Sequence, residues 1–529
     1  MTARQPYSLH PFAGWDLPRL VDAQADRLGS AIFLAWEPRD GTPTSMSYRE
    51  FADDSARVAY GLERRGVGRG DRVAIIAENC PEFLLTWAAC TRLGAIAVTL
   101  NTRLSALELR HAISDCGATV AVVQRAHQDT VADAAGDLIR SLIVIGDGQR
   151  IAPDGQVAAF DALLGDQATY RVQPPDPWLP ASIQYTSGTT ARPKGVVWTM
   201  GNLLWAARNG AVHEALTQAD TQLVCLPLFH MNAISTGVLA TLWAGSKVVL
   251  QPRFSASRFW PVSLRHRCTF AAIIPFMVHA LAQFEVPDNH HYRLWAQGIS
   301  APGSRTRFGV PTMGWWGMTE TTTVAIVSSP YHDDAPRGIG RPSPSYEVAV
   351  VDDEGHPVAA GVPGDLRVRG VPGLSLFQGY WGNETATREA FDDAGYLITG
   401  DIVRYDDDGV IKFVDRAKDM LKVGGENVAA SEIEHVIGKV PGVREVAVVG
   451  RPDRMLGEVA VAFVLPSSAG DNQLMQRIDS TCAQALADFK RPREVRLVSS
   501  LPRATVNKVA KGELRLLLQA DSSKPESQN

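Results

Sequence analysis

The chain contains 529 residues, which is more than one hydrophobic core usually holds and favours two or more domains. With 45% hydrophobic and 21% charged residues it does not read as disordered or fibrous, and its formal net charge of -5 argues against nucleic acid as a partner. The first residues lack the order of a secretory signal and no segment reaches about 18 uninterrupted apolar residues, so we expect a cytoplasmic protein without integral membrane contact.

The first half of the chain alternates between short apolar runs and stretches with helical periodicity. The expected order is a strand at 71–79, a helix at 81–94, a strand at 96–101, a helix at 105–117 and a strand at 119–124. Such a βαβαβ order predicts a parallel sheet covered by helices. A second set follows, with apolar runs at 181–185, 222–228, 247–252 and 270–276 and a helical stretch at 201–216. The sequence therefore predicts an α/β fold with two doubly wound halves.

The pattern changes twice in the second half. After Arg341, the alternating runs at 346–358 and 364–370 are joined by acidic and glycine-rich turns, which predicts a small antiparallel β subdomain. From Asp415 onward, helix candidates at 430–438 and 472–489 mix with strand candidates at 444–450, 459–466 and 494–499. These predict a separate α+β domain at the C-terminal end.

Six cysteines are scattered without a CxxC pair, mostly among apolar neighbours, which is typical of buried thiols in a reducing compartment. They are Cys80, Cys90, Cys116, Cys225, Cys268 and Cys482. Cys225 could instead be a nucleophile, but no motif surrounds it, so core packing is the favoured interpretation.

The loop YTSGTTARPKG at 185–195 is rich in groups that bind polyphosphate. Glycine lets backbone N–H groups converge on phosphate oxygens, hydroxyl groups donate to them, and an ammonium group supplies positive charge. The loop is not a Walker loop, because GxxxxGK[ST] is absent, and a connection that merely happens to be rich in serine and threonine is the alternative. The candidate residues are Thr186, Ser187, Gly188, Thr189, Thr190 and Lys194.

This loop resembles the phosphate-binding signature [YF]TSGTTGxPKG of the adenylate-forming superfamily of acyl-CoA ligases, luciferases and nonribosomal adenylation domains. The resemblance runs from about Asp22 to about Leu516, and strings such as VPGLSLFQGYW look most like bacterial crotonobetaine/carnitine-CoA ligases and fatty acyl-CoA ligases. It implies an adenylation core at 1–415 with the β subdomain at about 338–415 and a mobile C-terminal domain at 416–518, while the polar composition of 519–529 predicts a disordered tail.

Two further strings match the superfamily in order. In GWWGMTETT, the resemblance implies that Glu320 holds the magnesium bridging ATP phosphates, that Thr319 contacts the α-phosphate and that Trp316 stacks on adenine. In YLITGD, Asp401 resembles the ribose-binding aspartate, with a helix cap as the alternative. Thr186 is assigned to the metal together with Glu320. The remaining nucleotide contacts implied are Ser300, Ala301, Pro302, Trp315, Gly317 and Met318.

The C-terminal strings imply the catalytic cation and a moving domain. LPRATVNKVAKGELR places Lys508 on the catalytic lysine, whose ammonium would lie between the substrate carboxylate and the α-phosphate and lower the repulsion of two anions. In FVDRAKDMLKVGGEN, Arg416 would touch the ribose or phosphate and Lys418 would be the hinge. The face for coenzyme A would comprise Lys422, Gly424, Gly425 and Glu426, although a simple turn after a strand is the alternative for the two glycines.

His230 in LPLFHMNA matches the aromatic gate of the superfamily, and we interpret it as a residue beside the reacting groups and not as a general base. The acyl pocket implied by the resemblance is Phe229, His230, Met231, Ala233, Gly298 and Trp315. The catalytic candidates are Lys508, Glu320, Thr186, Lys194 and His230.

The function that the resemblance implies is an AMP-forming acid–thiol ligase. It would convert a carboxylic acid with MgATP to an acyl-adenylate and pass the acyl group to coenzyme A, and a homodimer is the suggested assembly. Three alternatives stay open, namely an enzyme specialised for one half-reaction, a free-standing enzyme that loads a carrier protein, and an inactive binding protein with the same fold. The joint presence of Lys194, Glu320, Asp401 and Lys508 argues against the last.

Overall fold

The structure is a computed structural model that describes residues 9–146, 157–165, 169–186, 193–298, 304–329, 338–416, 420–468, 471–502, 509 and 511–522. Its internal contacts divide the chain into two compact units. The first comprises Met1–Thr102, Ala112–Tyr185 and Gly195–Asp415, and the second comprises Arg103–His111, Thr186–Lys194 and Arg416–Asn529. The domain limits expected from the sequence stay a prediction.

An eight-stranded sheet, counted over the described residues, has the order β19-β9-β8-β4-β3-β5-β6-β7. Its strands are β3 (Arg72–Ile76), β4 (Ile96–Thr99), β5 (Val120–Gln124), β6 (Ser141–Ile145), β7 (Val157–Ala159), β8 (Pro180–Thr186), β9 (Lys194–Thr199) and β19 (Gly379–Tyr380). β3 pairs in parallel with both β4 and β5, which confirms the βαβαβ order predicted for 71–124. The run Val73–Ile76 is fully buried, as expected of a parallel strand covered on both faces.

A second sheet has thirteen strands among the residues described, in the order β17-β18-β20-β21-β16-β15-β14-β13-β12-β10-β11-β1-β2. Its first group is β1 (Ile32–Trp36), β2 (Thr44–Ser47), β10 (Thr221–Val224), β11 (Lys247–Leu250), β12 (Phe270–Ile273), β13 (Leu294–Gln297) and β14 (Thr312–Trp316). The strands from β10 to β14 pair in parallel, which confirms the second doubly wound half.

The same sheet continues into the predicted small β subdomain. Its strands there are β15 (Ile326–Val327), β16 (Gly338–Pro342), β17 (Glu347–Val351), β18 (Gly364–Arg369), β20 (Leu397–Tyr405) and β21 (Ile411–Arg416). β17 pairs with β18, and β18 with β20, in the antiparallel sense that the alternating runs predicted. The turn from parallel to antiparallel pairing begins at β15, which is antiparallel to β14.

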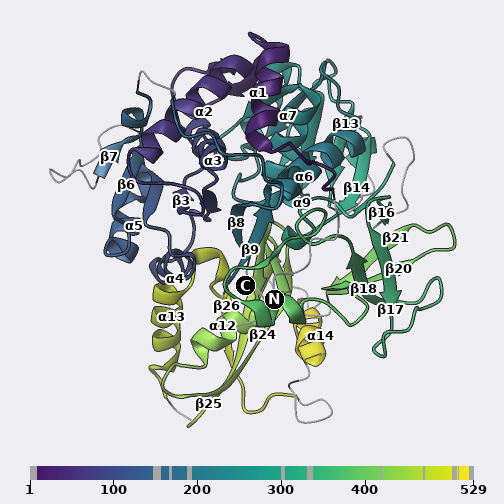
Figure 1. The fold of residues 1–529 in the computed structure, drawn as a ribbon. Helices are drawn as coiled ribbons and strands as arrows, with labels where there is room; N and C mark the ends of the chain where they lie inside the picture. Colours follow the sequence, from purple (N-terminus) through teal and green to yellow (C-terminus); the bar gives the residue numbers. More distant parts are fainter. Residues whose placement is uncertain are drawn as a thin grey trace. The chain divides into compact units, whose positions relative to one another are not determined.

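Helices cover the strands of the first unit. They and its short helical turns are α1 (Leu17–Leu28), α2 (Tyr48–Glu63), α3 (Pro81–Leu93), η1 (Arg125–His127), α5 (Gln128–Ala135), η2 (Phe160–Leu163), α6 (Met200–His213), η3 (Asn232–Leu239), α7 (Ala240–Ala244), α8 (Ala256–His266), α9 (Pro275–Leu281), α10 (Ser304–Phe308), η4 (Thr319–Thr321) and α11 (Glu384–Glu389). α4 (Ala106–Cys116) starts in the second unit and ends in the first. Figure 1 shows α1, α2 and α3 side by side in the purple N-terminal part, in agreement with their mutual contacts.

Local sequence explains where several of these helices begin and end. α2 starts at a capping box, in which the Ser47 hydroxyl accepts from the Glu50 backbone and the Glu50 carboxylate accepts from the Ser47 backbone. α3 starts with Pro81 at its first position and ends at Gly94, whose φ of 66° is the left-handed conformation that glycine adopts readily. These signals fix the helix ends before tertiary packing is considered.

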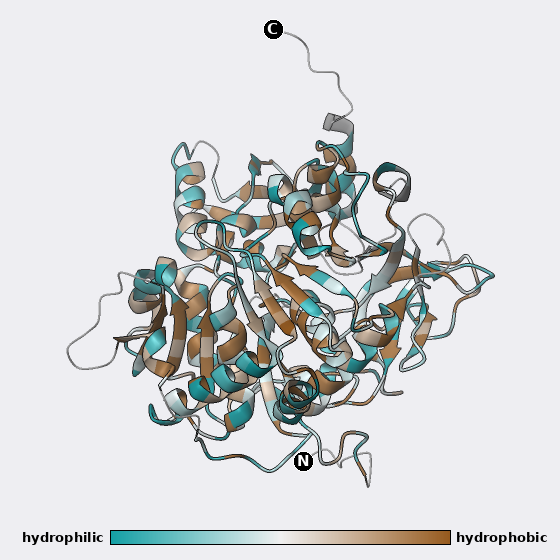
Figure 2. Cartoon of the chain, turned by 90° about the horizontal axis from the view of Figure 1, so that it is seen from above, coloured by the Kyte–Doolittle hydropathy of each residue, from teal (hydrophilic) through white to brown (hydrophobic). Residues whose placement is uncertain are grey.

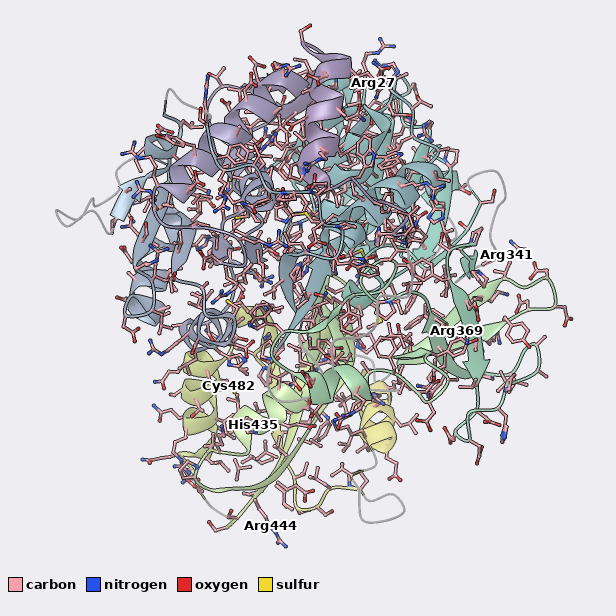
Figure 3. All side chains as sticks on the ribbon, in the orientation of Figure 1. Arg27, Arg341, Arg369, His435, Arg444 and Cys482 are labelled. Carbon is pink, nitrogen blue, oxygen red and sulfur yellow. The ribbon has the colours of Figure 1, made fainter. Side chains whose placement is uncertain are left out.

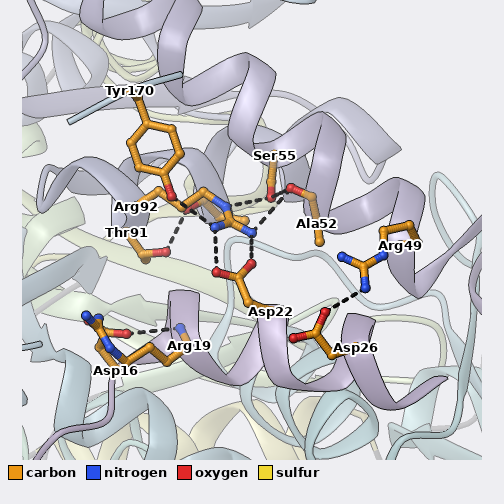
Figure 4. A network of polar contacts seen from close by, with 11 residues as sticks. Asp16, Arg19, Asp22, Asp26, Arg49, Ala52, Ser55, Thr91, Arg92 and Tyr170 are labelled. Carbon is orange, nitrogen blue, oxygen red and sulfur yellow. Dashed lines mark hydrogen bonds and ion pairs between the residues drawn. The ribbon is translucent and has the colours of Figure 1, made fainter. Parts of the chain in front are cut away.

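A buried arginine joins the N-terminal helices. The side chain of Arg92 on α3 donates to the Asp22 carboxylate on α1 at 2.6 Å, to the Ser55 hydroxyl on α2 at 2.9 Å and to the Tyr170 hydroxyl at 3.0 Å (Figure 4). Its side chain is 3% exposed, so the charge is satisfied almost entirely by protein groups. The contacts of one guanidinium therefore connect α1, α2 and α3.

The main core of the first unit lies between the sheets and these helices. Figure 2 shows brown on many of the strands and both brown and teal on the helices, as expected when apolar side chains form the core and polar ones face away from it. Trp198, Phe33, Phe83 and Phe377 are fully buried members of this core. Among the helices that the structure describes, none combines the length and apolar character that a membrane span requires.

The second unit contains a five-stranded sheet within the described residues, ordered β23-β22-β25-β24 with β26 paired to β25. Its elements are β22 (Met420–Val423), β23 (Glu426–Ala429), α12 (Ala430–Ile437), β24 (Val443–Asp453), β25 (Gly457–Pro466), α13 (Leu474–Ala485), η5 (Asp488–Lys490), β26 (Glu494–Leu497) and α14 (Lys511–Ser522). His435 on α12 and Cys482 on α13 mark its helices in Figure 3. The predicted α+β composition is confirmed, while α14 extends into the segment expected to be a tail.

A buried lysine organises part of the second unit. The Lys490 ammonium donates to the Glu432 carboxylate at 2.8 Å and to the Glu108 carboxylate, and all three side chains are at most 7% exposed. Glu108 lies in the segment Arg103–His111, which the contacts assign to this unit. A buried charge requires partners of this kind, and here two carboxylates share one ammonium.

Candidate active site

The string GWWGMTETT forms the end of β14 and a tight turn. A side chain at Gly317 would place its Cβ 2.6 Å from the carbonyl oxygen of Thr323, so the close approach requires glycine. The turn closes with a bond from the Thr321 backbone to the Met318 carbonyl at 3.0 Å. Thr322 follows with a φ of 58°, an uncommon and strained conformation for a β-branched residue. The backbone around Glu320 is therefore tightly determined.

Glu320 is held from several sides. The Tyr380 hydroxyl donates to its Oε1 at 2.8 Å, and its backbone carbonyl accepts from the Phe377 N–H at 2.8 Å. The Trp198 indole N–H donates to the carbonyl of the preceding Thr319 at 2.8 Å. The Glu320 residue is 5% exposed, so its carboxylate occupies a mostly buried, defined position. A carboxylate in such a position can serve as a ligand for a hard cation.

Asp401 lies on β20 and meets Trp316 of the same site. The Trp316 indole N–H donates to Asp401 Oδ2 at 2.8 Å, and the Asp401 backbone N–H donates to the Thr399 hydroxyl at 3.1 Å. Asp401 is 6% exposed and Trp316 is 7% exposed. The structure thus brings together two strings that stand 85 residues apart in sequence. The bond gives Trp316 a contact that the stacking role expected from the resemblance did not include.

The two adjacent tryptophans pack in different clusters. Trp315 belongs to a cluster with Phe270 and Leu294, whereas Trp316 belongs to the main core. Successive side chains of a strand point to opposite faces, which accounts for the separation. An assignment of Trp315 to both the nucleotide and the acyl pocket stays a prediction.

The phosphate loop enters and leaves at described residues. Thr186 is the last residue of β8 and Lys194 is the first of β9, and both are partly buried. Ahead of the loop, the Tyr185 hydroxyl donates to the Asp115 carboxylate at 2.6 Å, which ties the end of β8 to α4. The candidates between these strands lie outside the described residues, namely Ser187, Gly188, Thr189 and Thr190.

The acyl-pocket candidates gather near the start of η3. The rings of Phe229 and His230 meet at a centroid distance of 4.7 Å and an interplanar angle of 62°. Met231 is partly buried, Ala233 is buried at the first π-helical turn, and such turns occur frequently at functional sites. Gly298 follows β13, and a Cβ built there would meet no atom within 4 Å. Ser300, Ala301 and Pro302 lie outside the described residues.

The candidates for the coenzyme A face form a hairpin in the second unit. Val423 of β22 pairs with Glu426 of β23, so Gly424 and Gly425 are a two-residue turn. Their φ values of 60° and 91° match the turn type that favours glycine at both positions. Lys422 is exposed and Glu426 is buried. The two glycines therefore form a turn after a strand, and their role in binding coenzyme A stays a prediction.

The structure does not describe the side chains of three positively charged candidates. Arg416 is the last residue of β21 and its side chain is not described, while Lys418 and Lys508 lie outside the described ranges. Their roles rest on the sequence motifs.

The oxygen donors present suit magnesium bound together with ATP. No group of three or more His, Cys, Asp or Glu side chains in the described part of the chain is arranged to hold a metal ion. Magnesium that arrives with a nucleotide is held by one or two carboxylates, phosphate oxygens and water. The buried, oriented carboxylate of Glu320 fits that mode of binding.

Tyr380 and Trp198 were not predicted from the sequence as residues of this site. Both are aromatic residues in apolar surroundings, and nothing local indicates that their polar atoms reach Glu320 and Thr319, which lie 60 and 121 residues away. The string GYW around Tyr380 is the available signal, because the hydroxyl of a partly buried tyrosine usually has a hydrogen-bond partner.

The cysteines are not candidates for catalysis. All six are buried, as the sequence pattern predicted. Burial raises the pKa of the Cys225 thiol to about 12, so the thiolate that a nucleophile needs is not formed near neutral pH. Core packing is confirmed for Cys225.

Comparison with known proteins identifies the class. The family model described as "AMP-binding enzyme" matches residues 21–381, and the model for the C-terminal domain of AMP-binding enzymes matches residues 432–508. The chain therefore belongs to the AMP-binding enzyme family.

Individual CoA ligases and synthetases are similar to this chain over nearly its full length. Crotonobetaine/carnitine–CoA ligase of Salmonella typhi is 32% identical over 516 residues, covering 95% of this chain and 99% of that protein. The structure is similar to o-succinylbenzoate CoA synthetase from Bacillus subtilis, with a TM-score of 0.83, 27% identity and coverage of 95% and 99%. It is also similar to a Mycobacterium tuberculosis fatty acyl CoA synthetase, with a TM-score of 0.68, 28% identity and coverage of 96% and 99%.

These matches confirm the superfamily, the fold class and the class of enzyme that the sequence implied. The chain is an acyl-CoA ligase of the AMP-forming, acid–thiol type. Use of ATP and coenzyme A belongs to that class.

Proposed function

We propose that the chain carries out both half-reactions of an acid:CoA ligase at one site. In the first, a carboxylate oxygen of the acid attacks the α-phosphorus of ATP, the bond to the β-phosphate oxygen breaks, and pyrophosphate leaves. In the second, the sulfur of coenzyme A attacks the acyl carbonyl carbon, the bond to the AMP oxygen breaks, the thiol proton is released, and AMP leaves. The products are the acyl thioester, AMP and pyrophosphate.

The observation that carries this proposal is the bond from Trp316 to Asp401. It joins the string that contains Glu320 to the aspartate that the resemblance assigns to ribose. Asp401 would accept the ribose hydroxyls, and Trp316 would keep its carboxylate oriented. Glu320, with Thr186, would hold the magnesium of MgATP, and the ion would offset the negative charge of the phosphates.

Two lysines would offset the negative charge of the phosphates and of the substrate carboxylate. Lys194, at the end of the phosphate loop, would contact the phosphates, and Lys508 would lie between the substrate carboxylate and the α-phosphate. A fixed cation between two anions stabilises the pentavalent state most, because that state carries the highest local negative charge. We assign the largest single catalytic contribution to Lys508.

The coenzyme A face and the acyl pocket complete the proposal. Lys422, Gly424, Gly425 and Glu426 would face the thiol after the C-terminal domain turns about Lys418. Phe229, His230, Met231 and Ala233 would surround the acyl group, and the apolar side chains of Phe229, Met231 and Ala233 suit an acid with a hydrophobic part. A cytoplasmic location and a homodimer stay predictions.

The test measures the two half-reactions separately, with a panel of carboxylic acids. ATP–pyrophosphate exchange reports adenylate formation, and thioester release from supplied acyl-adenylate and coenzyme A reports the second step. We expect Lys508→Ala to lower the exchange rate by about 100-fold or more, as does the loss of a preorganised transition-state donor, while the second step largely survives.

A matched lysine controls for a general effect on the second unit. Lys439 is an exposed lysine that no motif singles out, and Lys439→Ala should change neither rate by more than about twofold. Unchanged exchange in Lys508→Ala contradicts the assigned role. Exchange without any thioester product in the native enzyme would favour the alternative of an enzyme specialised for adenylation.

A further inference from the structure

Three elements around Glu320 contact one another, namely β9, β19 and the turn that contains Glu320. β9 pairs with β19 in an antiparallel ladder in which Val196 lies opposite Tyr380. β9 also reaches the Glu320 turn through the Trp198 indole, and β19 reaches it through the Tyr380 hydroxyl. Each element thus contacts the other two. β9 is the strand that follows the phosphate loop. The hydrogen bond from Trp198 of β9 therefore connects this strand to the turn that carries the Glu320 carboxylate.

The backbone of Tyr380 is fixed on both sides. Its N–H donates to the Thr387 hydroxyl at 2.8 Å, and its carbonyl accepts from the Asn383 N–H at 3.2 Å. The following residue, Trp381, donates its N–H to the Gly195 carbonyl at 2.8 Å. These contacts leave little freedom for the chain at β19.

The ring of Tyr380 is fixed as well. It meets the Phe377 ring at a centroid distance of 4.9 Å and an interplanar angle of 61°, and Phe377 itself stacks on Phe391 at 5.9 Å. A tyrosine side chain has few rotatable bonds, so a fixed backbone and ring also fix the hydroxyl. The hydroxyl is therefore a rigid donor aimed at Glu320 Oε1.

The bond from Tyr380 to Glu320 is a neutral one. The Tyr380 hydroxyl donates to Glu320 Oε1 at 2.8 Å. A phenol carries no formal charge, so the bond orients the carboxylate without adding positive charge to it.

From this geometry we propose that Tyr380 is a positioning residue for metal binding, which holds the Glu320 carboxylate in the orientation that accepts the divalent cation of the metal–nucleotide complex. The inference rests on the proposed function of Glu320. Groups that orient a metal ligand without touching the metal commonly change metal affinity by about 10-fold to 100-fold when they are removed. Tyr380→Phe removes the donor and keeps the ring.

The experiment measures metal binding directly, without turnover. Free Mn²⁺ is followed by electron paramagnetic resonance while it is titrated into enzyme with a non-hydrolysable ATP analogue, and analogue binding is measured separately in EDTA. We expect Tyr380→Phe to weaken nucleotide-dependent Mn²⁺ binding by about 10-fold to 100-fold. Binding of the analogue in EDTA should change by less than about threefold, because the ring, the backbone and the loops remain.

A matched tyrosine separates orientation from stability. Tyr48 is 1% exposed and its hydroxyl donates to the Ser246 carbonyl at 2.7 Å, so Tyr48→Phe also loses one buried tyrosine bond within the first unit. We expect its Mn²⁺ binding to equal that of the native enzyme.

Thermal unfolding of both variants shows whether each is folded. If Tyr380→Phe does not fold, Tyr380→His is the second variant, because its shorter ring still carries a hydrogen-bond donor. Intermediate Mn²⁺ affinity of Tyr380→His supports the inference, and native affinity overturns it.

A double substitution tests whether Tyr380 acts through Glu320. If it does, Tyr380→Phe added to Glu320→Gln causes no further loss of Mn²⁺ affinity. An additive loss, native Mn²⁺ affinity in Tyr380→Phe, or an equal loss of metal-free analogue binding each overturns the inference. Absence of nucleotide-dependent Mn²⁺ binding in the native enzyme overturns the proposed function of Glu320 itself, so the two failures are distinguishable.

Discussion

Two buried carboxylate sites of the first unit differ in the groups that surround them. Glu37 has a side chain that is 1% exposed, and it contacts the Arg265 guanidinium at 2.8 Å, the His266 imidazole at 2.7 Å and the Arg258 guanidinium at 3.4 Å. Glu320 accepts from a phenol, and Asp401 accepts from an indole. The arginine partners of Glu37 supply compensating charge, whereas the phenol and the indole each orient one carboxylate oxygen through a neutral hydrogen bond. We therefore expect the Glu37 carboxylate to contribute mainly to stability, and the proposed ligands Glu320 and Asp401 to contribute mainly to nucleotide binding.

The largest expected effect comes from removing the charge at Glu320. Glu320→Gln keeps the shape but replaces a carboxylate by an amide, which is a poor ligand for a hard cation beside phosphates. We expect magnesium-dependent ATP–pyrophosphate exchange to fall by about 100-fold or more. The free energy of unfolding, measured with urea, should stay within about 1 kcal/mol of the native value or rise. A large loss of stability would place Glu320 in the same category as Glu37.

The converse substitution at Glu37 should affect stability and spare catalysis. Glu37→Gln leaves three partners without their carboxylate, and breaking a buried pair usually lowers the free energy of unfolding by about 3–5 kcal/mol. Arg265 is 56% exposed and can regain water, so we expect a smaller loss of about 1–3 kcal/mol in urea unfolding at pH 7. The kinetic constants of folded enzyme should not change.

The pH dependence of unfolding gives a second readout for Glu37. Although burial raises the pKa of Glu37, hydrogen bonds from His266 and Arg265 outweigh it, and the pKa lies below its ordinary value of 4.5. The unfolded carboxyl therefore binds a proton more readily, so the stabilisation is complete above about pH 4.5 and is lost as pH falls through the lower, folded pKa. Glu37→Gln should lack this part of the acid-induced loss. An unchanged acid profile would contradict the role of the charged partners.

The smallest effect is expected at Trp316. Trp316→Phe keeps an aromatic ring but removes the donor to Asp401, and a hydrogen bond to a charged group is worth about 1.5–3 kcal/mol. Because another donor or water can replace part of it, we expect KM for ATP to rise by about tenfold and the preference for ATP over 2′-deoxy-ATP to fall. Steady-state kinetics with both nucleotides measures this. A raised KM with an unchanged preference would favour stacking over orientation of Asp401.

Periodicity and turn chemistry were sufficient to predict most of the fold. The parallel order of β3, β4 and β5 follows from apolar runs separated by helical stretches, and the antiparallel β17 and β18 follow from alternation with acidic turns. The resemblance to the superfamily implied that Glu320 and Asp401 belong to one site, and this stays a prediction. Their bonding partners could not be predicted, because hydrogen bonds from Tyr380 and Trp316 depend on how distant strands meet in space.

The hairpin of Gly424 and Gly425 has a consequence for natural variation. A two-residue turn of this type commonly has asparagine or aspartate in place of glycine at its first position, here 424, because those side chains tolerate the left-handed conformation. A narrow passage for a pantetheine arm would accept neither, since any Cβ would intrude. Among proteins descended from a common ancestor with this chain, asparagine at 424 would thus mark lineages in which the loop is a turn and nothing more, and strict glycine would mark those in which a ligand passes it.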